Sequence, residues 1–389
     1  MKKTLMISGL ISSLFMGDLF SSASKRAWQN SKTQYDLFAA LSDKKESIEE
    51  IDHLIAQGAD ISRRTRDGQT ALMLAISRPS NYINLVRELL KRKCCDINAI
   101  DSDGDTALII AMRHGDIRLI KELLGQKNID INIKNKGGNT VLMVAIENRI
   151  DLEIVEELLK RPNIKVNVKN RDGDTALMLS IKNGPKYISI SRALLMLRNI
   201  DINVQNRNGE TALMLAVEAG SKLLNTTKTL LDFETLNINA KNKDGYTALM
   251  LAIKGAQQHN NIITELLKRK DVDLNVQNKR GETALMLANT ERTNILLEHL
   301  DDINLDTEDI NGNTALMRAA MENNVAKTDK LLAVGAGTAA LNKQGKSFID
   351  IVSDKPVLKN IYKEYLNNEV YEAVPSMPTD LIGIVSEYI

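Results

Sequence analysis

The chain has 389 residues, of which 43% are hydrophobic and 26% are charged, with 51 lysines and arginines against 50 aspartates and glutamates. One hydrophobic core seldom grows this large, so we expect several domains or a repeat array. The balanced charge argues against a protein that coats nucleic acid and against a highly charged disordered tail. Aromatic residues are scarce (5 Phe, 8 Tyr and 1 Trp, against 14 Met), which predicts a mainly aliphatic core.

The first 24 residues have the layout of a secretory signal peptide. Two lysines precede an apolar stretch from Leu5 to Phe20, and small residues follow it. This stretch is short for a membrane span, and no other segment is long and apolar enough to cross a bilayer. We predict that residues 1–24 are a signal peptide, so the protein is exported, secreted or periplasmic. The start resembles a bacterial signal peptide, which suggests that the protein comes from a host-associated bacterium and acts outside its cytoplasm.

Residues 25–66 are predicted to form an N-terminal capping repeat. Helical patterns run from Tyr35 to Leu41 and from Ile48 to Ile55, and a turn follows at Gly58. This segment lacks the opening motif that organises the rest of the chain. Terminal units of a repeat array differ from the internal ones in this way.

One motif, Thr-Ala-Leu-Met or a close variant, recurs eight times and predicts a repeat array over residues 67–353. Its threonines are 31 to 36 residues apart, at Thr70, Thr106, Thr140, Thr175, Thr211, Thr247, Thr283 and Thr314. A glycine stands two positions before each of them, at Gly68, Gly104, Gly138, Gly173, Gly209, Gly245, Gly281 and Gly312.

Each unit is predicted to consist of a turn and two helices. The Asp-Gly or Asn-Gly pair favours a turn in which glycine has a positive φ, and the threonine is placed to cap a short inner helix. A small residue at the sixth motif position, as at Ala75 and Ala216, allows helices to pack closely. The outer helix carries an apolar stripe, for example Leu152, Val155 and Leu158, and a short extended Asp-Ile-Asn segment leads to the next turn. Stacked units bury the apolar faces that one unit alone exposes.

These motifs resemble the ankyrin repeat family over about residues 34–353. The family's Thr-Pro-Leu-His is Thr-Ala-Leu-Met here, with Ala71 and Met73 in the second and fourth positions. The resemblance implies an all-α, ankyrin-like solenoid of helix-turn-helix repeats with short turn or hairpin tips. It also implies a protein–protein interaction scaffold with no chemistry of its own, binding protein partners as a monomer.

Residues 354–389 are predicted to be a C-terminal helical cap or tail. A decayed copy of the motif, with Ser347 in the threonine position, closes the array before it. Residues 375–389 form an amphipathic stripe that weakly resembles the opening helix of an F-box-like motif. Two interpretations stay open: a hydrophobic cap for the solenoid, and an adaptor that recruits ubiquitin machinery.

The sequence predicts no catalytic, cofactor or metal site. The four histidines are scattered over different units, and the adjacent Cys94 and Cys95 have no metal-ligand spacing around them. A methionine occupies one slot in seven of the eight motifs, which suits core packing better than thioether ligation.

The candidate partner-binding residues lie at the turns. Basic residues stand four positions before the threonine, at Arg66, Lys136, Arg171, Arg207, Lys243 and Lys279, and Tyr246 is the one aromatic residue at a turn. Acidic residues three positions after the basic ones could pair with them, which would leave only a solvated, self-neutralised row. The other interpretation is a row that binds protein partners. Nucleic-acid binding by the row is a further alternative, but the neutral overall charge counts against it.

Overall fold

The computed structural model describes residues 22–42, 48–77, 83–92 and 96–373, in two units, Met1–Arg171 and Asp172–Ile389. We describe each unit by itself. The described part of the chain is helical and contains no β-strand, apart from one isolated bridge between Ile100 and Thr106. The prediction of an all-α solenoid of helix-turn-helix repeats is confirmed.

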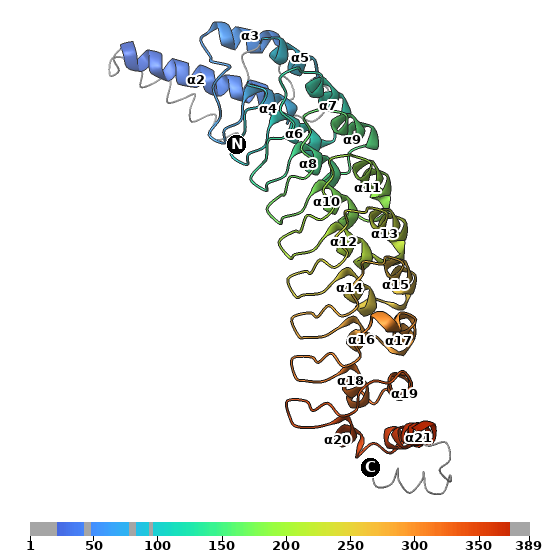
Figure 1. The fold of residues 1–389 in the computed structure, drawn as a ribbon. Helices are drawn as coiled ribbons and strands as arrows, with labels where there is room; N and C mark the ends of the chain where they lie inside the picture. Colours follow the sequence, from blue (N-terminus) through green and yellow to red (C-terminus); the bar gives the residue numbers. More distant parts are fainter. Residues whose placement is uncertain (1–21, 43–47, 78–82, 93–95, 374–389) are drawn as a thin grey trace. The chain divides into compact units, whose positions relative to one another are not determined.

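In the first unit, inner helices alternate with outer helices along the chain. The helices are α2 (Ser22–Ser42), α3 (Ile48–Ala56), α4 (Ala71–Ile76), α5 (Ile83–Lys91), α6 (Ala107–His114), α7 (Ile117–Leu124), α8 (Val141–Glu147) and α9 (Leu152–Leu159). Each α4, α6 and α8 is followed by an antiparallel outer partner, and the long turns project from the side of the inner helices (Figure 1).

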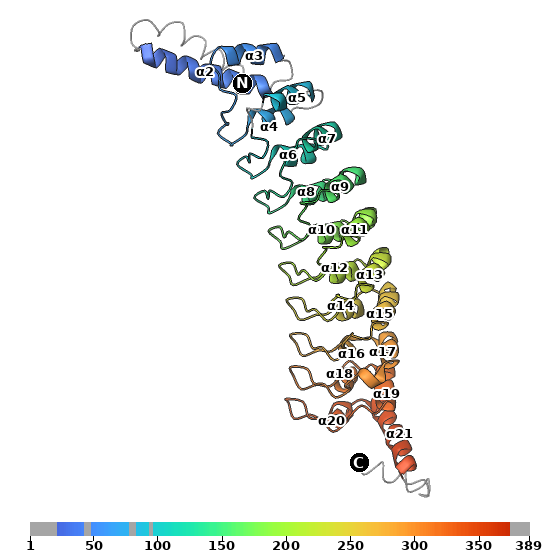
Figure 2. The ribbon, with the colours of Figure 1, turned by 45° about the horizontal axis from the view of Figure 1, so that its top comes forward.

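The second unit repeats this arrangement and adds short 3₁₀ helices. Its elements are α10 (Ala176–Lys182), η1 (Pro185–Tyr187), α11 (Ile188–Leu195), α12 (Ala212–Glu218), η2 (Gly220–Leu223), α13 (Leu224–Leu231), α14 (Ala248–Lys254), η3 (Gln257–His259), α15 (Asn260–Leu267), α16 (Ala284–Leu287), α17 (Thr290–Leu297), η4 (Leu300–Asp302), α18 (Ala315–Met321), α19 (Val325–Ala333), α20 (Phe348–Val352) and α21 (Pro356–Ala373). Figure 2 shows the same two layers and the same row of projecting turns in another orientation. The extra residues of the longer repeats form η1, η2 and η3, between an inner and an outer helix.

The predicted threonine cap is present on seven of the eight motif helices. In Thr211, for example, Oγ1 accepts a hydrogen bond from the N–H of Met214 at 3.3 Å, which satisfies one free donor of the first turn. Thr140 occupies the same position without this side-chain bond. The methionine column is core, as predicted, since every motif methionine is at most 3% exposed, and so are the small sixth-position residues apart from Ala288 at 4%.

The motif glycines have two physical reasons to be glycine. All eight have φ between 71° and 83°, as the turn prediction required. They also approach the backbone of the next repeat: a Cβ on Gly209 would lie 2.8 Å from the backbone nitrogen of Lys243. The sequence predicted the first reason and gave no sign of the second.

The outer helices bury a face that differs slightly from the predicted stripe. Leu152, predicted on the stripe of α9, is 37% exposed, whereas Ile154, Val155 and Leu158 are fully buried. The buried face of this outer helix therefore consists of two adjacent residues, Ile154 and Val155, and of Leu158 one turn later.

The Asp-Ile-Asn segments are turns, so the prediction that they are extended is wrong. Asp201 Oδ1 accepts the N–H of Asn203 at 3.0 Å, an Asx turn that competes with extended backbone. Asn203 also reaches the next repeat, where its Nδ2 donates to the carbonyl of Thr235 at 2.7 Å and its Oδ1 accepts the N–H of Asn237 at 2.8 Å. The same two bonds recur at Asn98, Asn132, Asn239 and Asn275.

The repeat that begins at Thr283 is short because its inner helix lacks a turn. Helix α16 ends at Leu287, and Asn289 already caps α17. The Nζ of Lys327, from the next outer helix, donates to the carbonyls of Leu285 (2.9 Å), Met286 (3.2 Å) and Ala288 (2.7 Å). A buried lysine therefore satisfies the carbonyls that the missing turn leaves open.

The two ends of the described chain bear on the predicted domain limits. Helix α2 begins at Ser22 and is continuous across the predicted boundary after residue 24, while residues 1–21 lie outside the described residues. The decayed copy is confirmed, because Ser347 and Asp350 form a capping box at the start of α20. Phe348 is buried and packs edge-on against Tyr362, with 5.4 Å between the ring centroids, so aromatic rings close this end of the core. The amphipathic segment at 375–389 lies outside the described residues.

Candidate functional site

The projecting turns are organised by a column of buried amides that the sequence analysis did not identify. In the second unit, Asn206 Oδ1 accepts the N–H groups of Asn208 (2.9 Å) and Glu210 (3.0 Å), which closes the turn around Gly209. Its Nδ2 donates to Asp174 Oδ1 of the preceding repeat at 3.0 Å. The recurring Asn three positions before the motif glycine was the available signal.

Each turn is also joined to the turn before it through the backbone of the basic position. The N–H of Arg207 donates to the carbonyl of Asp172 at 2.8 Å, and that of Lys243 to Asn208 at 2.8 Å. The same bond links Lys279 to Asp244 at 3.0 Å and, in the first unit, Lys136 to Asp103 and Arg171 to Gly137, both at 2.8 Å. Hydrogen bonds between successive turns therefore hold the backbone of each of these basic residues in place.

We call the six basic residues Arg66, Lys136, Arg171, Arg207, Lys243 and Lys279 the tip row. Within the first unit, Lys136 and Arg171 are on successive turns, and Ser102 separates them from Arg66. Within the second unit, Arg207, Lys243 and Lys279 are on three successive turns. All six are exposed, and in the described part of the chain none of their side chains has an ion-pair partner within 4.0 Å.

The second unit adds a basic residue that the sequence analysis missed. Lys343, in the decayed copy, is exposed, and its N–H donates to the carbonyl of Asn311 at 2.9 Å as in the other turns. Between Lys279 and Lys343 the equivalent position is Ile310, which is 52% exposed. Counting four residues back from Ser347 would have found Lys343.

The interpretation in which nearby acids pair with the tip row is not what the contacts of the second unit show. Glu210 bonds to Asn206 Nδ2 (2.8 Å), and Glu282 bonds to Asn278 Nδ2 (2.7 Å) and to Arg318 Nη1 (2.6 Å). These acids are directed toward the inner helices, because the buried amides and helix cations lie there. The cations of the tip row are therefore left without the neutralisation that the sequence suggested.

A second set of contacts joins several turns to the far end of their own inner helices, eight residues on. Asp105 pairs with Arg113 at 2.8 Å and, in the second unit, Asp174 pairs with Lys182 at 2.6 Å. Tyr246 occupies the acidic position, with Lys254 Nζ 4.2 Å from its ring centroid. Tyr246 is half-buried beneath this cation and lies beside the inner helix, so the structure does not place it with the exposed side chains of the tip row.

One pair in this set has like charges. Glu218 stands eight residues after Glu210, at the spacing where Arg113 follows Asp105 and Lys182 follows Asp174. Desolvation at the end of α12, and then the neighbouring Glu210 carboxylate, raise the pKa of Glu218, while Lys182 lowers it less.

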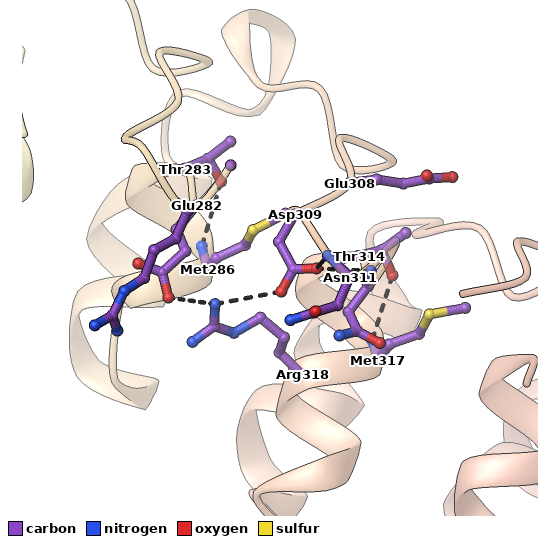
Figure 3. Close-up of polar contacts among 12 residues, drawn as sticks. Glu282, Thr283, Met286, Glu308, Asp309, Asn311, Thr314, Met317 and Arg318 are labelled. Atoms are coloured by element: carbon purple, nitrogen blue, oxygen red, sulfur yellow. Dashed lines mark hydrogen bonds and ion pairs between the residues drawn. The ribbon is translucent and has the colours of Figure 1, made fainter. Parts of the chain in front are cut away.

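The next irregular position carries the densest polar network (Figure 3). Asp309 replaces the buried Asn that Asn206, Asn278 and Asn342 supply elsewhere in the second unit, so it has no amide to donate to Glu282. Arg318 lies between the two carboxylates instead, with Nη1 2.6 Å from Glu282 and 3.6 Å from Asp309. Burial alone would raise the pKa of Glu282, but the bonds from Asn278 and Arg318 lower it below its usual range.

Other chemistry finds little support in the described residues. No group of three or more His, Cys, Asp and Glu side chains there could hold a metal ion. Among the same residues, no helix combines the length and the apolar character that crossing a bilayer needs. His259 is buried, with Nδ1 3.0 Å from the carbonyl oxygen of Ala256, and Cys94 and Cys95 lie outside the described residues.

Comparison with protein-family models agrees with this architecture. A family model described as "Ankyrin repeats (3 copies)" matches residues 37–135, 113–206, 186–273 and 255–342, which together span most of the chain. Among solved structures, the crystal structure of EF0377, an ankyrin repeat protein, is 28% identical, with a TM-score of 0.44, and the match covers 51% of this chain and 97% of that one. No curated protein matches significantly. Ankyrin repeats indicate a protein–protein interaction scaffold, and the extent of the family match shows that this chain belongs to the ankyrin repeat family.

Proposed function

We propose that this protein binds an acidic segment of a partner protein along the tip row of its second unit. The observation that carries the proposal is the set of three successive exposed cations, Arg207, Lys243 and Lys279, without ion-pair partners among the described residues. The acids three positions after Arg207 and Lys279, Glu210 and Glu282, are bonded elsewhere. Their backbones are linked from turn to turn, so the charges hold a fixed register. A pre-ordered row loses little conformational entropy when a partner binds.

The charges of such a row act mainly on the rate and specificity of association. Exposed cations steer an acidic partner and discriminate against a basic one, and salt screens this attraction over about 8 Å at physiological ionic strength. We therefore expect an affinity that falls with salt and with each cation removed. Catalysis is not part of the proposal, and one chain is taken as the binding unit.

The test uses a fluorescein-labelled 16-residue peptide of alternating Glu and Ser, titrated with the full chain and followed by anisotropy. The triple variant Arg207→Ala/Lys243→Ala/Lys279→Ala is expected to weaken binding about tenfold or more and to flatten its salt dependence. The matched control, Lys186→Ala/Lys222→Ala/Lys270→Ala, removes three exposed lysines of the same unit away from the turns. Equal loss in both variants would mean that only net charge matters and would contradict the proposal.

We also propose that the protein is exported, as its first 24 residues suggest. Support comes from the order of basic, apolar and small residues there. Mass spectrometry of the protein recovered from its native source is expected to find an N-terminus near residue 25. An intact Met1 in every recovered molecule would contradict export by this route.

The alternative role, an adaptor for ubiquitin machinery, depends on residues 375–389. It predicts that ubiquitin-ligase components are captured by the full chain and lost when these residues are deleted. An unchanged set of captured proteins would rule out the adaptor and leave the tip row as the proposal.

A further inference from the structure

Three positions that keep their residue type elsewhere in the second unit change together around one turn. Asp309 stands where the other turns have Asn, and Ile310 stands where the tip row has a cation. Arg318 takes a position in the inner helix where the other motif repeats place Leu, Ile or Val. A fourth residue, Met321, takes the place eight residues after the last turn residue, where earlier repeats have Lys182, Glu218, Lys254 and Thr290.

Two of these changes compensate each other. Asp309 and Glu282 are buried carboxylates, with side chains 5% and 7% exposed, and Arg318 supplies the positive charge that both need. A repeat with Asn and Leu at the two positions, as in the rest of the unit, needs no such charge. Arg318 compensates the negative charge that Asp309 introduces, whereas Asn and Leu at the two positions introduce no charge. The ion pairs therefore do not by themselves explain why this repeat departs from Asn and Leu.

A cavity of about 320 Å³ lies at these residues, in the face formed by the turns and the inner helices. Ile310 and Met321, which are 52% and 41% exposed, line it together with Arg318, whose side chain is 22% exposed. Figure 3 shows Arg318 directed between the turn that carries Asp309 and the preceding one that carries Glu282. The cavity thus has two exposed apolar residues and a polar wall in which Glu282, Asp309 and Arg318 are paired with one another, while Arg280 and Glu322 lie exposed at its edge.

The cavity interrupts the tip row at a defined point. Reading along successive turns, Lys279 precedes Ile310 and Lys343 follows it, and backbone hydrogen bonds of 2.9 to 3.0 Å join each turn to the one before it. The exposed side chains therefore run from cations to one apolar residue and back to a cation. A partner complementary to this order carries acidic residues on both sides of a large apolar residue.

We propose that this cavity receives one large apolar side chain of the acidic segment that the tip row binds. The proposal rests on the proposed function, since the row supplies the acidic part of the specificity. Ile310 and Met321 contact the apolar side chain, and removing their exposed surface from water contributes affinity. The cavity volume suits a residue such as leucine or phenylalanine. Lys279 and Lys343 then fix which residue of the partner is opposite the cavity.

The experiment is a selection of random 16-residue peptides displayed on phage against the full chain, followed by anisotropy with the selected peptide. We expect selected sequences to be acidic with one Leu, Ile, Met or Phe flanked by acidic residues. Ile310→Lys, which completes the basic row, is expected to weaken the selected peptide at least about tenfold. Replacing the apolar residue of the peptide by serine should weaken wild type equally and should change the variant little.

Two further variants keep the result interpretable. Asp309→Asn/Arg318→Leu restores the regular residues of the unit without removing Ile310, so it is expected to fold and to bind more weakly because the cavity is altered. Met196→Lys is the matched control, since Met196 is 79% exposed at the end of α11, and it should change affinity less than twofold. Circular dichroism of each variant checks folding.

The outcomes separate the two proposals. Acidic peptides without a preferred apolar residue, or an affinity that Ile310→Lys leaves unchanged, would overturn the cavity proposal and leave the tip row standing. Selected peptides that are basic or uncharged, or no selected peptide at all, would overturn the proposed function together with the cavity.

Discussion

Replacing Lys327 by Met should change how the stability of the protein depends on pH. Lys327 is 1% exposed, and its ammonium group donates to three backbone carbonyls at the end of the short helix α16. Burial lowers its pKa from 10.5 to about 8, although Glu322 raises it somewhat and Arg318 lowers it further. Lys327→Met removes the titrating group and keeps an unbranched side chain of similar length.

The sign follows from the number of protons bound in each state. Between pH 8 and 10.5 the unfolded chain keeps the Lys327 proton and the folded protein releases it, so rising pH favours the folded state. Below pH 8 both states are protonated, and the cost of the buried charge is fully present. The wild type should therefore gain about 2 kcal/mol relative to Lys327→Met between pH 7 and pH 9.5, from about 1.4 kcal/mol for each pH unit inside the window.

Urea unfolding followed by circular dichroism at both pH values measures this difference. Lys330→Met, on the same helix, is the control for losing a lysine as such. Coincident transitions at two wavelengths should be checked first, because repeat arrays can unfold in parts. A free-energy difference between wild type and Lys327→Met that is the same at pH 7 and pH 9.5 would refute the assigned pKa.

Three further predictions concern other contacts. Arg318→Leu alone should lower the free energy of unfolding in urea by about 3 kcal/mol, because it leaves two buried carboxylates without their cation. Adding Asp309→Asn should recover most of this loss, and a double variant no more stable than the single one would contradict the compensation. Gly209→Ala should lower the thermal midpoint more than Gly335→Ala, because both have a positive φ but only Gly209 also faces backbone at 2.8 Å; equal shifts would exclude the close approach as a cause. Glu218→Gln should raise the free energy of unfolding at pH 7, since the folded state holds the proton of Glu218 more tightly than the unfolded chain, and the gain should vanish near pH 4; a gain independent of pH would point to another cause.

Much of the fold could be predicted from the sequence because the repeat is local. The turn glycine, the capping threonine and the buried methionine act within a few residues of one another, so their spacing predicts an inner helix wherever it recurs. The outer helices were also predicted, but Leu152 shows that a stripe does not define which neighbouring positions the inner helix covers. The Asp-Ile-Asn turns were misread because their side-chain bonds, including those to the next repeat, compete with extended backbone.

The candidate site divides in the same way. The tip row was found from spacing alone, because equivalent positions of a solenoid line up from repeat to repeat. Whether nearby acids neutralise it stayed open at the level of sequence, because residues three apart in a turn need not face each other. Glu282 shows why: its carboxylate meets Arg318, 36 residues further along the chain, rather than the lysine three residues before it.

The sequence by itself determined the repeat unit, its number of copies and the positions that face outward at the turns, since these depend on contacts within one repeat. Only the tertiary structure decided which charges are neutralised, which glycines meet a neighbouring backbone, and where the regular surface opens into a cavity. Those features arise where residues of two repeats meet. Arg318 between Glu282 and Asp309, and Lys327 at the end of α16, owe their roles to residues that the chain brings from about 10 to 42 positions away.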